Sequence, residues 1–286
     1  MTRRALVLGT GGPAASSWET GVITGLADAG IDVRNADLFV GTSARSRVAA
    51  QITSKVTLEE LFQQQADPRL QTKGLEVKID FKQLKGDYVR ARRGDGGNIG
   101  FLRRMGALAM AASTGPESER RNVIASQLPV QTWPEPRLLA VAVDAESGER
   151  RVFDRTAGVP LLDAVAASCA VPGMSPTITI EGRHYMDGAV YSADNADLAG
   201  GFDRVLILTL TPGVPQTRVL SLDAAVEMLR SNGSQVLVVH PDEATEAAFS
   251  AVGGNIPDPS VREGAARAGR EQGRRIAALD VASLWQ

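Results

Sequence analysis

The sequence contains few of the residues that most often carry out chemistry, with a single cysteine, Cys169, and only two histidines, His184 and His240. One cysteine excludes an internal disulfide and gives no sign of an oxidising compartment. Because Cys169 stands in an apolar run, we expect it to be a buried structural thiol. In a Ser-His-Asp triad the base would have to be one of these two histidines, so this alternative can be tested directly.

The sequence also lacks a long apolar run and an excess of one charge. No stretch of about 18 apolar residues occurs, so we expect no membrane-spanning helix. The chain enters an apolar strand within its first four residues, which leaves no room for a secretory signal, and we expect a cytoplasmic protein. A net charge of -2 gives no general attraction to nucleic acid. We expect no nucleic-acid partner.

Short apolar strands alternate with helical segments along the chain. Apolar runs of strand length occur at 4–8, 38–40, 137–143, 204–210 and 235–239. This alternation predicts an α/β fold with a largely parallel central sheet. We expect a hairpin partner for 137–143 at 150–153, a short strand at 178–180, and a polar turn over 182–189. The length allows the chain, 1–286, to form a single domain.

A serine stands where one predicted strand turns into a helix. Gly41-Thr-Ser43-Ala-Arg45 follows the strand 38–40 and precedes a helical segment. On such a turn the serine Oγ is lifted clear of the sheet, and the helix N-terminus directs N–H groups at developing negative charge. The nucleophile motif G-x-S-x-G is met only in part, because Arg45 replaces the second glycine. The alternative interpretation is an ordinary turn with a helix N-cap.

A glycine-rich loop, G-T-G-G-P-A-A at 9–15, follows the first predicted strand, and a helix is predicted from about 18 to 29. One interpretation is a dinucleotide site, because the loop fits G-x-G-x-x-A. That site needs an acidic residue at the end of the second strand, which this chain does not offer. The other interpretation is an oxyanion hole for Ser43, since neighbouring parallel strands bring their following loops to one edge of the sheet.

An activated serine needs a base within hydrogen-bond reach. A triad with His240 is disfavoured, because the α/β-hydrolase nucleophile follows several strands and Ser43 follows only the second. His184 lies in a segment that is more easily interpreted as a strand end. The remaining candidate is Asp187, which begins Asp-Gly-Ala at a predicted turn, although a hairpin corner would explain that turn equally well. An aspartate has a reference pKa of about 3.9, so burial would have to raise it.

Residues 73–104 differ in character from the rest of the chain. They hold nine Lys or Arg against four Asp or Glu, and apolar and basic residues interleave at 88–93 and 101–104. One interpretation is a solvated helical face with a flexible loop. The other is a lid or membrane-facing insertion over 73–115, with transient membrane contact through 73–104, where basic groups meet phosphate and apolar faces meet acyl chains.

In their order and spacing these motifs resemble the patatin-like phospholipase family of bacterial serine acyl hydrolases. The family's G-G-G-x-x-G loop corresponds to 10–15, its G-x-S-x-G to 41–45, its A-x-P segment to 170–172 and its D-G-[GA] to 187–189. The resemblance spans residues 4 to 200. It implies a three-layer α/β/α, lysophospholipase-type fold with a mostly parallel central sheet.

The resemblance also implies a function and a set of roles. It implies a phospholipase A or esterase that cleaves carboxylic esters of lipids through an acyl-enzyme, without a metal or organic cofactor. Ser43 would be the nucleophile and Asp187 its base in a Ser-Asp dyad. Gly11 and Gly12 would donate hydrogen bonds to the oxyanion. The partner would be a lipid or acyl-ester substrate.

Three residues depart from the family pattern at the site itself. Thr10 and Ala15 replace glycines of the loop, which would be strained if either position required a positive φ. Arg45 would have to bend the elbow or point into the site, where it could contact an anionic head group, with Thr10 as a second substrate contact. A catalytically impaired patatin-fold protein that binds a lipid, acyl or anionic ligand in the same cleft is therefore the alternative function.

Overall fold

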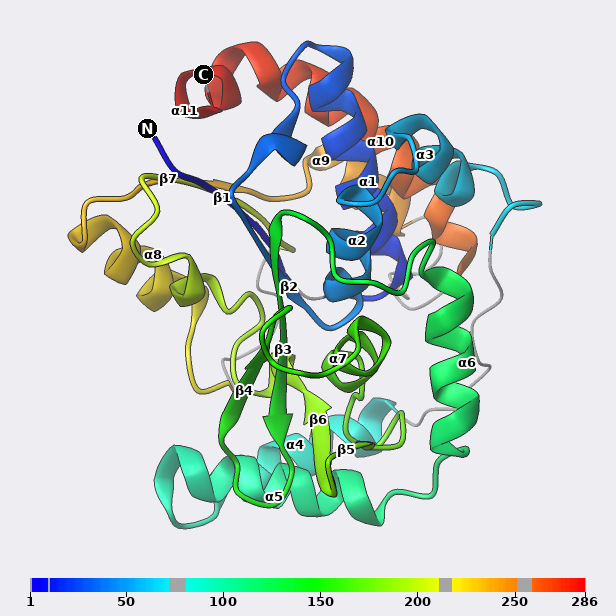
Figure 1. Ribbon diagram of the computed structural model, residues 1–286, viewed down its shortest axis with the longest axis vertical. Coiled ribbons are helices and arrows are strands. Elements are labelled where there is room, and N and C mark those ends of the chain that lie inside the picture. Colours follow the sequence, from blue (N-terminus) through cyan, green and yellow to red (C-terminus); the bar gives the residue numbers. More distant parts are fainter. Residues whose placement is uncertain (1, 10, 72–80, 211–217, 251–258, 286) are drawn as a thin grey trace.

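The strands of the protein form one twisted sheet in a computed structural model, which describes residues 2–9, 11–71, 81–210, 218–250 and 259–285 (Figure 1). Thr10 and the segment 72–80 lie outside these residues. The described strands are β1 (Arg4–Leu8), β2 (Leu38–Thr42), β3 (Arg137–Asp144), β4 (Arg150–Phe153), β5 (Ile178–Ile180), β6 (Arg183–Asp187), β7 (Arg204–Leu208) and β8 (Gln235–Val239). Their order is β5-β6-β3-β2-β1-β7-β8, with β4 also beside β3.

The helices follow the strands in alternation. The described α-helices are α1 (Pro13–Asp28), α2 (Ala44–Ile52), α3 (Leu58–Ala66), α4 (Phe81–Arg93), α5 (Gly97–Ala111), α6 (Glu117–Gln127), α7 (Leu161–Ser168), α8 (Leu222–Ser231), α9 (Glu243–Ser250), α10 (Arg262–Ile276) and α11 (Ala282–Trp285). Short 3-10 turns complete the chain at η1 (Val33–Asn35), η2 (Gly188–Val190), η3 (Ala196–Ala199) and η4 (Pro259–Val261), with a π-turn at η5 (Ala277–Val281). None of these described helices is both long and apolar enough to cross a membrane.

Both faces of the sheet are covered by helices. Side chains alternate between the faces of a strand, so Leu6 and Phe39 pack on one face with residues of α1, α2, α7 and α10. Val7 and Val40 pack on the opposite face with residues of α8 and η3. Figure 1 shows α8 on one side of the sheet and α1, α2 and α10 on the other. The expected α/β fold with a mostly parallel central sheet is confirmed, since β3, β2, β1, β7 and β8 run parallel.

Strand β3 brings the ends of two other strands together. Its edge toward β2 pairs Val141 with Thr42, and the next residue, Ala142, pairs with Asp187 of the antiparallel strand β6. Strand β4 occupies the opposite edge over residues 140–143, so β2 and β6 must share one edge of β3. The carboxyl ends of β2 and β6 therefore meet at adjacent residues of β3.

Two local expectations need correction. Residues 183–187 form strand β6 rather than a turn, and the hairpin corner is at Glu181 and Gly182, both of which have positive φ. The polar composition of β6 concealed it, because an antiparallel strand does not need a continuous apolar run. Helix α1 begins at Pro13 rather than near residue 18, since proline is favoured in the first helical turn. Residues 97–111, within the segment expected to be a solvated face or a lid, form one helix, α5.

Helices α1 and α10 approach each other through glycines. A Cβ atom at Gly21 would lie 2.2 Å from the Ala266 carbonyl oxygen, and one at Gly269 would lie 2.4 Å from the Trp18 carbonyl oxygen. These contacts are between backbones, so a side chain on either glycine would push the helices apart. The crossing fixes the position of α1, whose first turn follows the glycine-rich loop.

We expect Gly269→Ala to destabilise the protein, although alanine is the better helix former. The new methyl group would overpack the crossing, at a cost of about 1–3 kcal/mol in the free energy of unfolding measured with denaturant. Gly264→Ala in the same helix is the matched control, because its Cβ would lie 3.4 Å from the Ala248 Cβ, an ordinary contact. Equal stability of the two variants would contradict this explanation of the crossing.

Candidate active site

Ser43 stands on a strained turn between β2 and α2. Its backbone has φ 60° and ψ −136°, a conformation that residues other than glycine rarely adopt. Ser43 occupies the N-cap position of α2, as the alternative interpretation expected, but its side chain makes no capping hydrogen bond to the helix. Gly41 allows the turn, because a Cβ there would lie 2.5 Å from the Cα of Ser46. The Ser43 N–H donates to Ser168 Oγ at 3.0 Å, which ties the turn to the end of α7.

Asp187 accepts a hydrogen bond from the Ser43 hydroxyl. Ser43 Oγ donates to Asp187 Oδ2 at 2.6 Å, and the Ala189 N–H donates to Oδ1 at 2.8 Å. The Asp187 N–H donates to the Ala170 carbonyl at 2.9 Å, so the Ala-Val-Pro segment holds the end of β6. Glycine is required at position 188, because a Cβ there would lie 2.4 Å from the Val141 carbonyl oxygen of β3.

The aspartate is deeply buried and its proton affinity is correspondingly high. Asp187 is 1% exposed and Ser43 is 8% exposed. Burial raises the pKa of Asp187 to about 6, against the lowering effect of its hydrogen bonds from Ser43 and Ala189. Desolvation disfavours the charged form of a carboxyl group. A carboxylate of this pKa is a better proton acceptor than an exposed aspartate at neutral pH.

The glycine-rich loop carries the two expected oxyanion donors. Within the described part of the chain, neither the Gly11 nor the Gly12 N–H has a hydrogen-bond acceptor. Gly12 is the N-cap residue of α1, where the first N–H groups of a helix have no partners in the helix. Ala15 lies inside α1 and needs no positive φ, so the expected strain at this position does not arise. Thr10 is outside the described residues.

The position of Arg45 differs from the expectation that it would bend the elbow or point into the site. The residue continues α2, and its side chain is fully buried. Nη1 donates to the Gly11 carbonyl at 2.6 Å and to Ser16 Oγ at 2.9 Å, and Nε lies 2.5 Å from Glu19 Oε2. Arg45 therefore holds the glycine-rich loop against α1, and its Nη2 is buried without a hydrogen-bond partner among the described residues.

Two buried carboxyl groups surround Arg45. Burial raises the pKa of Glu19, and the charge of Arg45 is the largest influence opposing that rise. Asp194 is also buried beneath the loop, next to Gly9, where a Cβ would lie 2.1 Å from its Oδ1. Burial likewise raises the pKa of Asp194, and its hydrogen bond from Thr209 is the largest influence opposing that rise.

Neither histidine is bonded to Ser43. His240 Nδ1 lies 3.0 Å from the Thr209 carbonyl oxygen, and His184 Nδ1 lies 3.3 Å from Thr179 Oγ1. Cys169 is 3% exposed, in keeping with the expected buried thiol. Among the described residues, Asp187 is the titratable group that meets the Ser43 hydroxyl.

Four polar residues that support the site were not identified from the sequence. Glu19, Ser168, Asp194 and Asn195 are all buried, and Asn195 donates to Thr42 Oγ1 at 3.1 Å. Only Glu19 could have been identified from the sequence. It is a charged residue in a helical segment whose neighbours, such as Val22 and Ile23, are apolar. A charged side chain at such a position is paired when buried.

A comparison with family models finds one match, described as patatin-like phospholipase, over residues 6–199. No curated protein sequence matches the chain. The match includes the glycine-rich loop, Ser43 and Asp187.

Three solved structures are similar to the chain at low identity. VipD from Legionella pneumophila is 12% identical with a TM-score of 0.48, and the match covers 97% of this chain and 67% of VipD. The type III effector protein ExoU is 12% identical with a TM-score of 0.41, covering 97% and 53%. Full-length ExoU of Pseudomonas aeruginosa, in complex with SpcU, is 15% identical with a TM-score of 0.38, covering 98% and 60%. The chain thus spans about two thirds of VipD and less of ExoU.

We expect Arg45→Gly to destabilise the protein rather than improve its elbow. The change would remove the cation beside Glu19 and leave a cavity, and removing one partner of a buried pair costs about 3–5 kcal/mol. Thermal and denaturant unfolding would measure the loss. In the control, Glu19→Leu combined with Arg45→Met, both charges are removed, and most of the stability should return. A stable Arg45→Gly protein with faster ester hydrolysis would show instead that Arg45 impairs the native site.

Proposed function

Since the chain belongs to the patatin-like phospholipase family, we propose that it is a lipid acyl hydrolase that cleaves carboxylic esters through Ser43 and Asp187. The single observation that supports this best is the 2.6 Å hydrogen bond from Ser43 Oγ to Asp187 Oδ2, on a serine held at positive φ. A nucleophile and its base within hydrogen-bond reach are what acyl transfer requires.

In the first half of the reaction, Ser43 Oγ attacks the carbonyl carbon of the ester. Asp187 accepts the hydroxyl proton as the new C–O bond forms, and it can do so because its raised pKa brings its proton affinity closer to that of the reacting group. The Ala189 N–H keeps Oδ1 occupied, so Oδ2 is the oxygen presented to the serine. The proton then passes from Asp187 to the leaving alcohol, which leaves an acyl group on Ser43.

The negative charge of the tetrahedral intermediate needs donors that are already in place. The N–H groups of Gly11 and Gly12 are the proposed donors, and the N-terminus of α2 directly after Ser43 adds a favourable dipole. Arg45 contributes indirectly, because its hydrogen bond to the Gly11 carbonyl fixes the peptide that follows Gly11. Water then attacks the acyl-enzyme and Asp187 takes its proton. As the bond between the acyl carbon and Ser43 Oγ breaks, Asp187 returns that proton to Oγ, and the acid is released.

Two of the three departures that favour the impaired, ligand-binding alternative have explanations that are compatible with catalysis. Ala15 is an unstrained helical residue, and Arg45 lies beneath the loop as a positioning residue. Thr10, the third departure, lies outside the described residues and is the one that still favours the ligand-binding alternative. The same cleft could hold a lipid or acyl ligand without turnover, and covalent labelling distinguishes the two functions.

The basic segment expected to act as a lid or membrane-facing element contains α4 and α5, which pack on the end of β6. Arg104 donates to the Ala91 and Gly94 carbonyls, so this basic residue caps the C-terminal end of α4. Ile99 and Met110 are exposed on α5, at 45% and 43%. We propose transient contact of this surface with a membrane or lipid aggregate, as exposed apolar residues beside arginines allow.

We expect a fluorophosphonate probe to label the native protein covalently, because the probe reacts only with an activated serine. Ser43→Ala should take no label, and Asp187→Asn should be labelled far more slowly. Ser46→Ala is the matched control, since Ser46 Oγ donates to the Ser43 carbonyl and lies one helical turn away from the proposed chemistry. A folded native protein that takes no label would favour the ligand-binding alternative.

We expect kcat/KM for a soluble ester to fall as the pH drops below about 6, the pKa to which burial raises Asp187. The ionised form is the base, so each pH unit below the pKa should reduce the rate about tenfold. The pKa is higher in the folded than in the unfolded chain, so protonation of Asp187 favours the folded state as the pH falls. Circular dichroism at pH 5 would verify that the protein is folded. A rate that is constant down to pH 4.5 would exclude Asp187 as the base.

A further inference from the structure

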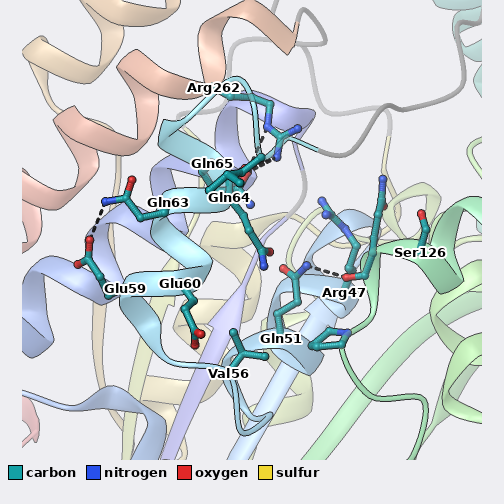
Figure 2. A pocket seen from close by; sticks show the side chains of 13 residues that line it. Arg47, Gln51, Val56, Glu59, Glu60, Gln63, Gln64, Gln65, Ser126 and Arg262 are labelled. Atoms are coloured by element: carbon teal, nitrogen blue, oxygen red, sulfur yellow. Dashed lines mark hydrogen bonds between the residues drawn. The ribbon is translucent and has the colours of Figure 1, made fainter.

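A cavity with many polar lining residues lies between helices α2, α3 and α6 and the start of α10 (Figure 2). Its volume is about 530 Å³, within the range of small-molecule sites. Figure 2 shows Arg262 above the glutamines of α3, with Arg47 facing them from α2. None of the residues proposed for catalysis lines this cavity.

The two arginines of the cavity have no negative partner within the described residues. Arg262 is 9% exposed, and its Nε and Nη2 donate to the neutral Gln65 Oε1 at 3.2 and 2.8 Å. Arg47 makes a single long contact, from Nη2 to Ser16 Oγ at 3.5 Å. A buried cation without a counter-charge costs several kcal/mol, and buried charges in proteins are normally paired.

The electrostatics of the cavity agree with this geometry. Burial lowers the pKa of Arg47 to about 10, and the charges of Arg262, Arg45 and Arg120 lower it further. Burial also lowers the pKa of Arg262. Both changes follow mainly from desolvation, which disfavours the charged form of a guanidinium group.

The acidic residues at the other end of the cavity are already engaged. Glu59 lies 2.9 Å from Arg270 Nη2 and accepts a hydrogen bond from Gln63 Nε2 at 2.7 Å. Glu60 accepts from the Thr57 N–H and hydroxyl in the capping box of α3. In Figure 2 both carboxylates lie on the side of α3 away from Arg47. They therefore leave the charge of the arginine end uncompensated.

We propose that the arginine end of this cavity binds a phosphate group, with Arg47 and Arg262 as its charged donors. Guanidinium groups match the oxygens of phosphate in pairs, and two of them balance the charge of a phosphate monoester or diester. Gln64 and Gln65 lie between the two arginines and add carboxamide groups. The phosphate could be free or part of a lipid head group.

The cavity lies close to the proposed nucleophile. Arg47 follows Ser43 by four residues on α2, which is about one helical turn or roughly 5–6 Å along the axis. Ser16, which Arg47 contacts, also bonds Arg45 behind the glycine-rich loop. A lipid phosphate held at Arg47 would thus lie near an ester presented to Ser43. This assignment to a lipid substrate rests on the proposed function, whereas phosphate binding itself does not.

The test of the site uses Ser43→Ala protein, so that binding is measured without turnover. Inorganic phosphate and glycerol 3-phosphate are titrated by calorimetry and by thermal shift, since a ligand that binds the folded state stabilises it. We expect binding that weakens roughly tenfold or more with Arg47→Met, because a charge-assisted hydrogen bond contributes about that factor. Arg230→Met, an exposed arginine on α8, is the matched control and should bind as before.

Gln65→Glu is the decisive variant, because it places a carboxylate beside Arg262 with almost no change of shape. We expect the variant to be at least as thermally stable as the parent and to lose phosphate binding, which separates loss of the site from loss of the fold. Unchanged phosphate binding in both Arg47→Met and Gln65→Glu, or no binding by the parent, would overturn the proposal.

A second experiment uses protein with native Ser43 to distinguish a lipid head group from free phosphate as the ligand. The KM of a soluble short-chain phospholipid is compared with that of the diacylglycerol carrying the same acyl chains. A ratio of the two KM values that rises roughly tenfold in Arg47→Met assigns the site to the lipid head group. An unchanged ratio, together with lost phosphate binding, assigns it to a free phosphate ligand. Absence of hydrolysis of either ester would refute the proposed function and leave the binding result standing.

Discussion

The candidate active site depends on one register of the sheet, the pairing of β2 and β6 with consecutive residues of β3. Thr42 pairs with Val141, and Asp187 pairs with Ala142. The parallel neighbours of β2 do not give Ser43 a carboxylate partner, because β1 ends at Leu8 and the carboxylate of Asp144, at the end of β3, is bonded to Arg183. The antiparallel hairpin β5–β6 supplies one by running back toward the end of β2. Since a slip of one residue reverses the direction of every side chain in a strand, this register determines whether Asp187 faces Ser43.

The second constraint is electrostatic. The turn around Ser43 and the glycine-rich loop are surrounded by buried ionisable groups, namely Glu19, Arg45, Asp187 and Asp194. Each costs free energy to bury, and their mutual contacts recover part of it. Glu19 is paired with Arg45, yet burial raises the pKa of Glu19 to about 8, and burial also raises the pKa of Asp187 to about 6. Arg45 holds the glycine-rich loop in place, and Asp187 is the buried carboxyl group that accepts the hydrogen bond from Ser43.

The sequence predicted the α/β class and most strands, because buried parallel strands are apolar runs between helices. It also selected Ser43 and Asp187 as partners, and the structure places their oxygens 2.6 Å apart, while their catalytic roles stay a prediction. It missed β6, whose residues Arg183–Asp187 are mostly polar. It also missed Glu19 as the partner of Arg45, because the two residues are 26 positions apart and meet only when α1 packs against α2.

The error over Arg45 has a geometric cause that also explains the cavity beside it. In the sequence, Arg45 and Arg47 are two similar residues after a serine, and either could have faced a ligand. Residues two apart on an α-helix are about 200° apart around its axis, so the two side chains leave α2 in different directions, although both guanidinium groups reach Ser16 Oγ of α1. Arg45 is buried against the glycine-rich loop, whereas Arg47 lines the cavity with Arg262. A ligand with negative charge would therefore meet Arg47, and the arginine within the serine motif has a structural partner instead.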